Sequence, residues 1–105
     1  MVIALVEQNL DELGELCRAY RVRRLDLFGS AATADAFDPQ RSDLDFLVEF
    51  EPEQDLGPWL RHYFDFQRAL TELMGRPVDL VMDSALKNPH FIREVQRTRT
   101  TLYAS

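Results

Sequence analysis

The sequence predicts an α/β (α+β) fold, in which helices flank a small mixed sheet of about three strands. Three stretches have the alternation or the apolar content of a strand, over residues 24–28, 43–50 and 78–82. Segments with a helical spacing of apolar residues precede, separate and follow these stretches. Because helical and extended segments alternate along the chain, one layer of sheet covered by helices accounts for the pattern.

The length and composition predict one globular domain spanning residues 1–105. Apolar residues make up 46% of the chain and charged residues 29%, which is typical of a globular protein. No apolar run is long enough for a membrane-spanning helix, and the first residues lack the basic segment of a signal peptide. We therefore expect a cytoplasmic protein without a membrane partner.

The charge balance limits the kinds of partner. The chain has 12 Lys and Arg residues against 18 Asp and Glu residues, a net charge of −6. A protein that binds the backbone of DNA or RNA needs a basic surface, so direct nucleic-acid binding is not expected. A small nucleotide remains compatible, because metal cations can neutralise its phosphates. Cys17 is the single cysteine, which excludes an internal disulfide and a cysteine-based metal cluster.

The first part of the chain predicts a helix, a short strand and a short helix. The first helix runs from Val6 to Tyr20 and carries Cys17 on its apolar face, where we expect it to be buried. A strand follows over residues 24–28 and is broken by Gly29-Ser30. The composition then favours a short helix that begins at Ala31.

The second part predicts a strand, a long helix, another strand, a last helix and a tail. The clearest strand runs from Asp43 to Phe50, with apolar residues alternating on one face. The long helix covers Trp59 to Met74. A strand over residues 78–82 and a helix from Pro89 to about Arg97 follow it. The tail over residues 100–105 should pack back on the body of the domain.

The long helix carries four aromatic residues, Trp59, Tyr63, Phe64 and Phe66. A domain of this size needs its large side chains for the core, so we expect these four to be buried. The alternative is an exposed stripe that binds a partner.

Two aspartates on one strand predict a metal site. Asp43 and Asp45 lie at positions i and i+2, which share a face and lie roughly 6.5–7 Å apart along the strand. Carboxylate oxygens favour Mg²⁺ over zinc, and two carboxylates can share or bridge metal ions. Asp-x-Asp alone is also compatible with an exposed sheet face. Asp79 would join the same acidic cluster if its strand lay beside theirs.

The Gly29-Ser30 turn predicts a phosphate site. A glycine that ends a strand lets the backbone approach a ligand closely. A helix that begins at Ser30 would direct backbone N–H groups toward an anion. Taken alone, such a turn is most often only a turn, so the prediction depends on its combination with the aspartates.

Together these features resemble a known family. Phe28-Gly29-Ser30, the run from Ser42 to Val48 and the run from Val78 to Val81 are similar to the minimal nucleotidyltransferases of the DNA polymerase β superfamily. The resemblance covers nearly the whole chain and implies a nucleotidyltransferase fold like the palm of polymerase β.

The resemblance implies a role for each matching residue. ATP would be the substrate, with attack on its α-phosphorus and loss of pyrophosphate. Asp79 would help to activate the attacking hydroxyl as a base. The implied nucleotide-binding residues are Gly29, Ser30 and Thr33. The implied catalytic and Mg²⁺-binding residues are Asp43, Asp45 and Asp79.

The resemblance also implies a protein partner. Proteins of this kind are typically antitoxins of a helical HEPN toxin, an RNase, and transfer AMP to a tyrosine of that toxin. We therefore expect a complex, and oligomers, with a cognate HEPN-domain toxin. The acidic net charge is compatible with a basic partner.

Two departures from the family pattern leave alternatives open. Thr33 stands where the family commonly has Arg, and the gap between Ser30 and Asp43 is longer than usual. Arg41, within this gap, is a candidate for the missing positive charge. One alternative is a protein with a weak or inactive site that neutralises the toxin by stoichiometric binding. A small-molecule nucleotidyltransferase is less favoured, because such enzymes usually add a domain that builds the acceptor site.

Overall fold

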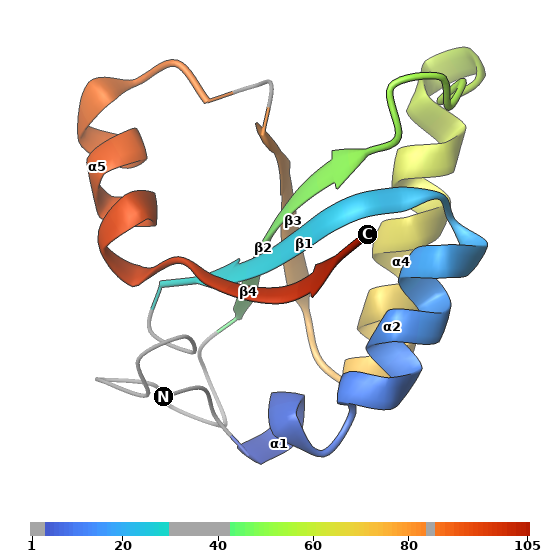
Figure 1. The fold of residues 1–105 in the computed structure, drawn as a ribbon, viewed down its shortest axis with the longest axis horizontal. Helices are drawn as coiled ribbons and strands as arrows, with labels where there is room; N and C mark the ends of the chain where they lie inside the picture. The colour runs from blue at the N-terminus through green and yellow to red at the C-terminus, as the bar shows by residue number, and fades with distance from the viewer. Residues whose placement is uncertain (1–3, 30–42, 84–85) are drawn as a thin grey trace.

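The fold is a four-stranded mixed sheet with helices on both faces (Figure 1). The computed structural model describes residues 4–29, 43–83 and 86–105. The strands are β1 (Val22–Phe28), β2 (Leu44–Phe50), β3 (Val78–Met82) and β4 (Thr100–Ala104), in the order β3-β2-β1-β4. β1 is antiparallel to β2 and β4, whereas β2 is parallel to β3. The predicted fold class is confirmed.

The fourth strand corrects the prediction of about three strands. The sequence predicted a tail over residues 100–105, but Thr100–Ala104 pairs with β1. A segment this short shows little periodicity in its sequence, and it becomes a strand because it pairs with the free edge of β1. Leu102 and Tyr103 do pack against the core, as expected.

The predicted first helix is two helices, α1 (Ala4–Glu7) and α2 (Leu10–Ala19). Asn9 separates them. Its side-chain Nδ2 donates to the carbonyl oxygen of Leu5 at 2.8 Å, while its own carbonyl accepts the N–H of Leu13 at 2.9 Å. The side chain of Asn9 thus caps the C-terminal end of α1, and its carbonyl accepts the first backbone hydrogen bond of α2.

The later helices end close to where the sequence predicted. α4 (Arg61–Met74) stops at Gly75, whose φ of 69° suits glycine. α5 (Pro89–Thr98) follows Asn88, whose side-chain oxygen accepts two backbone N–H groups of the first turn. The short helix predicted at Ala31 lies outside the described residues.

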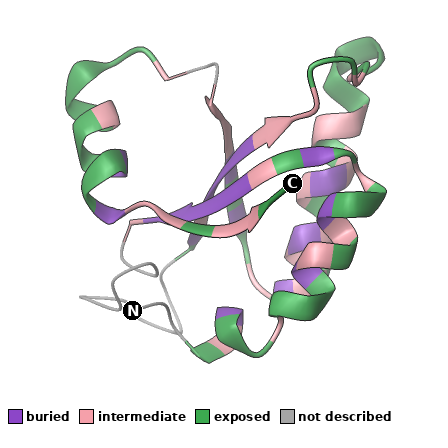
Figure 2. Cartoon of the chain, in the orientation of Figure 1, coloured by how far each residue is buried: buried purple, intermediate pink, exposed green. Residues whose placement is uncertain are grey.

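The helices cover the two faces of the sheet unequally. α2 and α4 pack together on one face, and α5 lies on the other (Figure 1). Figure 2 shows the buried sides of α2 and α4 turned toward the strands. The smaller cluster under α5 consists of Phe28, Leu47 and Val95. The main core contains Leu13, Cys17, Leu25, Leu27, Leu44, Phe46, Val48, Phe66, Leu70, Val78 and Leu80.

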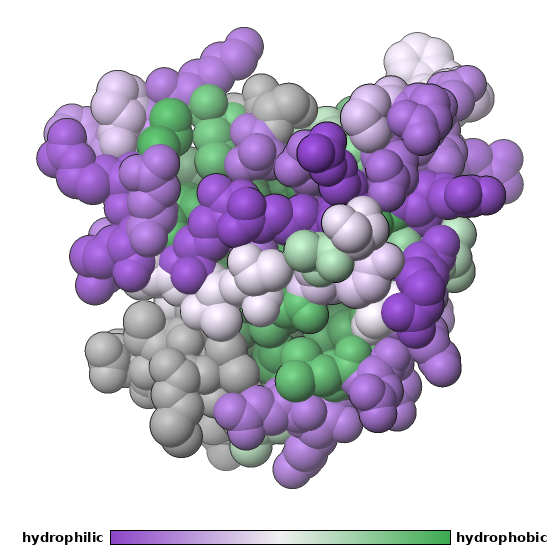
Figure 3. Space-filling model, viewed as in Figure 1, coloured by the Kyte–Doolittle hydropathy of each residue, from purple (hydrophilic) through white to green (hydrophobic). Residues whose placement is uncertain are grey.

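Polar and apolar side chains are separated on the surface that the figures show. On the face drawn in Figure 3, hydrophilic side chains cover α2 and α5, and apolar side chains gather between β4 and α1. In the parts of the chain that the structure describes, no helix is long and apolar enough to cross a membrane. Cys17 is buried as predicted, and burial raises the pKa of its thiol to about 12.

Two of the four aromatic residues predicted for the core are exposed. Phe66 is buried and Tyr63 is half-buried, but Trp59 is 94% exposed and Phe64 is 51% exposed. Trp59 is exposed because α4 does not extend back to it, whereas Phe64 lies within α4 on a side that the core does not cover. A kinked 3₁₀ turn, η1 (Pro58–Leu60), precedes α4 and takes Trp59 away from the buried face that a continuous helix would give it.

One charged side chain is fully buried against the sheet. The carboxylate of Asp26, on β1, accepts hydrogen bonds from Nε of Arg24 at 3.1 Å and from Nε of Arg99. Burying a carboxylate is costly unless it is paired, and the two guanidinium groups supply the pairing. Arg99 connects α5 to β4, so this ion pair fixes both elements to the middle of the sheet.

We expect Arg99→Ala to lower the free energy of unfolding by about 3 kcal/mol, because it leaves the buried carboxylate of Asp26 with Arg24 alone. Urea unfolding at pH 7 measures the loss. Arg97→Ala is the matched control, since Arg97 forms an exposed ion pair with Glu94 and such pairs contribute little. Equal losses in the two variants would contradict a structural role for the buried pair.

Candidate active site

The register of the sheet brings together the end of β1 and the starts of β2 and β3. Phe28, the last residue of β1, lies opposite Asp45 on antiparallel β2, and Asp45 lies beside Asp79 on parallel β3. Residues in register share a face of the sheet, so one phenyl ring and two carboxylates form a row across three strands. Gly29 follows Phe28 directly and lies at the end of this row.

Asp45 and Asp79 form a carboxylate pair. Their side chains lie within hydrogen-bonding reach of each other, so that a proton held by one can be shared with the other. Burial raises the pKa of Asp45, and the charges of Asp79 and Asp43 raise it further, to about 6. Asp45 is half-buried and Asp79 is exposed, so the pair is open to solvent on the Asp79 side.

Asp43 lies apart from this pair. The sequence predicted that the strand begins at Asp43, but β2 begins at Leu44 and Asp43 is exposed just before it. The charge of Asp43 acts on Asp45. Among the residues described, however, no three acidic, histidine or cysteine side chains converge closely enough to hold an ion. The predicted metal ligands therefore form a contacting pair and a third carboxylate immediately before the strand.

Gly29 occupies a position where a side chain would collide with this pair. Its φ is 78°, in the left-handed region, and a Cβ atom here would lie 2.7 Å from Oδ2 of Asp45. Its N–H donates to Oγ1 of Thr98 at 2.9 Å, and that hydroxyl donates to the carbonyl oxygen of Glu94 at 3.0 Å. The Gly29 turn is thus attached to α5 and packed against the carboxylate of Asp45.

The other two predicted nucleotide-binding residues, Ser30 and Thr33, lie outside the described residues, as does Arg41. The structure therefore places only Gly29 of the predicted phosphate-binding turn. The roles of Ser30 and Thr33 stay predictions.

The carboxylate pair lines a cleft of about 410 Å³ beside β3. α4 contributes Tyr63, Phe64 and Gln67 to its walls, and α5 contributes Phe91, whose ring meets the ring of Phe28 edge-on at 5.8 Å between centroids. Sequence reasoning assigned none of these side chains to the site. Their spacing is that of ordinary amphipathic helices, and only the docking of α4 and α5 on the sheet brings them to the carboxylates.

α4 also covers the outer edge of β3. The hydroxyl of Tyr63 donates to the carbonyl of Leu80, and Nε2 of Gln67 donates to the carbonyl of Val78 at 3.0 Å. β3 lies at the edge of the described sheet, and these bonds give its backbone partners in place of a further strand. Burial, and then the charge of Asp79, raise the pKa of the Tyr63 hydroxyl, so that it remains a donor.

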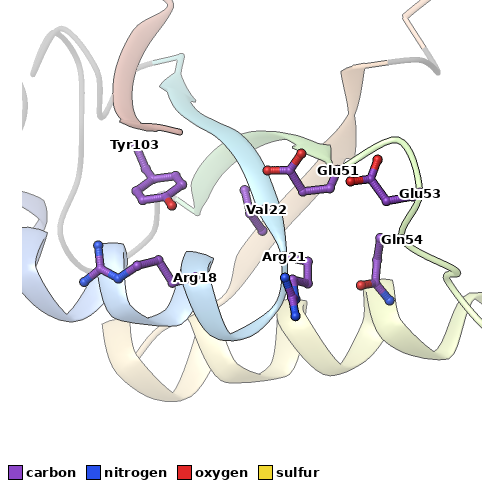
Figure 4. A pocket seen from close by; sticks show the side chains of 7 residues that line it. All are labelled: Arg18, Arg21, Val22, Glu51, Glu53, Gln54 and Tyr103. Carbon is purple, nitrogen blue, oxygen red and sulfur yellow. The ribbon is translucent and has the colours of Figure 1, made fainter.

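A larger cavity, of about 570 Å³, lies away from the aspartates. Figure 4 shows arginines on its helical side and glutamates from the loop after β2. It contains side chains of both charges but none of the three aspartates, so its size alone does not make it the site. Its lining residues are Arg18, Arg21, Val22, Glu51, Glu53, Gln54 and Tyr103.

The family model of the nucleotidyltransferase domain matches residues 11–101 of the chain. The matched region contains the Gly29-Ser30 turn and Asp43, Asp45 and Asp79. The chain belongs to the nucleotidyltransferase family. The resemblance inferred from the turn and the aspartates is thereby confirmed, and with it the class of enzyme.

Two relatives of this nucleotidyltransferase cover most of its length. The protein adenylyltransferase MntA of Thermococcus cleftensis is 38% identical over 74 residues, which are 70% of this chain and 69% of its own. A Methanocaldococcus jannaschii protein, inferred to be a protein adenylyltransferase, is 35% identical over 77 residues, 73% of this chain and 72% of its own.

Solved structures share the fold of this nucleotidyltransferase. One, inferred to be a minimal nucleotidyltransferase, is 29% identical, with a TM-score of 0.72 and 95% of each chain covered. A chain from a toxin–antitoxin crystal structure with AMP-PNP is 19% identical, with a TM-score of 0.68 over 92% of this chain and 74% of its own. A chain from the complex of the tri-AMPylated Shewanella oneidensis HEPN toxin with MNT antitoxin is 18% identical. Its TM-score is 0.64, and the match covers 94% of this chain and 72% of its own. At the identities of the last two, the likeness shows the fold alone.

The carboxylate pair should make the stability of the metal-free nucleotidyltransferase depend on pH. The pKa of Asp45 is about 6 in the fold against an ordinary value of 3.8, so the folded protein binds more protons than the unfolded chain between these values. The free energy of unfolding should therefore fall as the pH rises from about 4 to about 6, and level off above that. Urea unfolding in EDTA at several pH values, compared with Asp45→Asn, isolates this effect. A constant difference between the two proteins across this range would contradict it.

Substitution of Gly29 should disturb the site more than the fold. Gly29→Ala and Gly75→Ala both place a Cβ at positive φ, which costs about 1 kcal/mol of stability in each case. Only at Gly29 does the added atom meet the carboxylate of Asp45, since nothing lies within 4 Å of it at Gly75. We expect nucleotidyl transfer to fall about 100-fold in Gly29→Ala and to stay near wild type in Gly75→Ala. Equal activities of the two variants, measured at equal folded concentration, would refute the close approach.

Proposed function

We propose that this nucleotidyltransferase uses Mg²⁺ to transfer AMP from ATP to a tyrosine hydroxyl of a HEPN-domain toxin, and so acts as its antitoxin. The observation that carries the proposal is the contacting pair of Asp45 and Asp79 beside the Gly29 turn. The name of the Thermococcus cleftensis relative, a protein adenylyltransferase, supports a protein as acceptor.

The carboxylates suit Mg²⁺. Asp45 and Asp79, with Asp43 immediately before the strand, offer only oxygen ligands, which Mg²⁺ prefers. Burial, and then the charges of Asp79 and Asp43, raise the pKa of Asp45, and a divalent cation would offset this concentration of negative charge. None of the described residues that line the cleft is a histidine or cysteine, the usual ligands of zinc. Bound Mg²⁺ would supply charge neutralisation for the triphosphate and the departing pyrophosphate.

The proposed reaction forms one bond and breaks one. The tyrosine oxygen attacks the α-phosphorus of ATP, and the bond from that phosphorus to the bridging oxygen breaks as pyrophosphate leaves with the electron pair. The hydroxyl proton passes to a carboxylate, for which Asp79 is the candidate because it is exposed on the open side of the cleft. Gly29, without a side chain, lets the backbone of the turn pack directly against the carboxylate of Asp45.

The comparisons and the charge support the partner and the nucleotide. One structural relative is a toxin–antitoxin crystallised with AMP-PNP, an ATP analogue. Another comes from a complex of a tri-AMPylated HEPN toxin with an MNT antitoxin. The net charge of −6 favours association with a basic protein.

A second function is favoured by one residue. Thr33 stands where the family commonly carries Arg, and a hydroxyl is a weaker partner for a triphosphate than a guanidinium. In this second function the chain neutralises its toxin by stoichiometric binding, without transfer of AMP.

We expect Asp45→Asn and Asp79→Asn each to lower AMP transfer about 100-fold or more, because each removes a carboxylate from the reacting centre. Intact-mass measurement of the cognate HEPN-domain protein, after incubation with ATP and Mg²⁺, counts the AMP units added. Glu49→Gln is the matched control. Glu49 lies on the same strand as Asp45 but does not line the cleft, and its carboxylate lies 3.7 Å from the guanidinium group of Arg23. Wild-type labelling by either Asp variant would refute the assigned roles.

Toxin neutralisation in cells separates the two functions. If AMP transfer is the function, Asp45→Asn fails to neutralise the toxin although it still forms the complex. If stoichiometric binding suffices, Asp45→Asn neutralises the toxin as well as the wild type does.

A further inference from the structure

Three exposed apolar residues lie together where α4 begins. Trp59 is 94% exposed, Phe64 51% and Leu60 40%, and we call this group the apolar stripe. Leu60 is the residue before α4 and Phe64 lies in the first turn of that helix, so all three residues belong to the start of α4. Single exposed apolar residues are ordinary on a protein surface, but a contiguous group indicates a contact with another molecule.

The backbone holds Trp59 in solvent under strain. Trp59 has a φ of 56° and Leu60 a φ of 55°, both in the left-handed region that bulky residues rarely adopt. Two hydrogen bonds fix the turn. The N–H of Gly57 donates to Oδ1 of Asp55 at 2.8 Å, and the N–H of His62 donates to the carbonyl oxygen of Leu56 at 2.9 Å. Strain of this kind gathers at functional sites, and here it buries no side chain in return.

Phe64 connects the apolar stripe to the carboxylates. It lines the cleft that contains Asp45 and Asp79, and its ring meets that of Tyr63 edge-on at 4.9 Å between centroids. The apolar stripe therefore has one member on the wall of the cleft, and its other two members directly precede the same helix. A protein substrate whose hydroxyl reaches Asp45 and Asp79 would therefore also contact Phe64.

The charges near the apolar stripe select the kind of molecule. Asp55 is exposed and accepts the N–H of Gly57 just before Trp59, Asp79 is exposed and lines the cleft, and Asp65 lies 3.9 Å from Arg61, the cation beside Leu60. An acidic rim favours a basic face on the partner. A second copy of this chain is disfavoured, because each copy carries a net charge of −6.

We propose that the apolar stripe, Trp59, Leu60 and Phe64, docks the protein that accepts AMP, with Trp59 inserted into an apolar pocket on a basic face beside the acceptor hydroxyl. The inference rests on the proposed function and adds the surface that selects the protein substrate. Tryptophan is enriched among the residues that carry most of the energy of protein interfaces, especially where it fills a pocket.

The test compares two apolar residues that are exposed on different helices. Trp59→Gly removes the indole and leaves a residue that suits the φ of 56°, so the turn is kept. Leu10→Ala is the control, since Leu10 is 40% exposed, as Leu60 is, but lies on α2. Calorimetry without nucleotide measures the Kd for the cognate HEPN-domain protein. We expect Trp59→Gly to weaken binding about 30-fold or more and Leu10→Ala to leave it near wild type.

Two further measurements separate docking from chemistry. Binding of AMP-PNP with Mg²⁺ should be unchanged in Trp59→Gly, because Trp59 lies outside the cleft. In AMP transfer, the KM for the HEPN-domain protein should rise while kcat at saturation stays near wild type. If the wild type binds that protein but transfers no AMP, the proposed function fails and the two Kd values still decide the docking surface.

Three results would overturn the docking surface. The first is an equal Kd for the wild type and Trp59→Gly, and the second is a wild type that does not bind the HEPN-domain protein. The third is a wild-type dimer in sedimentation that Trp59→Gly converts to a monomer, which would assign the apolar stripe to a second copy of the chain.

Discussion

The pairing of β2 with its two neighbours is the constraint on which the candidate site depends. Parallel pairing with β3 sets Asp45 beside Asp79, and antiparallel pairing with β1 sets Phe28 opposite Asp45 and Gly29 beyond it. A shift of one residue in either register would turn a carboxylate to the opposite face, into the apolar core under α2 and α4. The core that fixes the register therefore also fixes the geometry of the site.

Two aspartates on the face under α5 meet opposite environments. Asp26 is fully buried and is neutralised by Arg24 and Arg99, so it ties α5 and β4 to the sheet. Asp45 is half-buried and meets a second carboxylate, Asp79, so its pKa rises. The first arrangement stabilises the fold. The second gathers negative charge for which no ion pair is found in residues 4–29, 43–83 and 86–105, an arrangement that suits a metal or nucleotide site.

Different residues of α4 pack against the sheet and line the cleft of the candidate site. Its buried residues, Phe66 and Leu70 among them, complete the main core, while Tyr63 and Gln67 bond to the edge of β3. Phe64, between these residues in the sequence, is left on the wall of the cleft. A helix needed for folding thus also carries Phe64, one of the three residues of the apolar surface that we propose selects the protein substrate.

The sequence by itself determined the fold class and the family, because alternation, helical spacing, the Gly29-Ser30 turn and the spacing of the aspartates are local patterns read along the chain. It did not determine the strand at Thr100–Ala104 or the exposure of Trp59. The first depends on the free edge of β1 and the second on a kinked turn that ends the helical spacing. Only the tertiary structure decided that Asp45 and Asp79 touch and that Phe64 lines their cleft. These contacts join residues far apart in the chain, and the packing of α4, α5 and the sheet sets their distances.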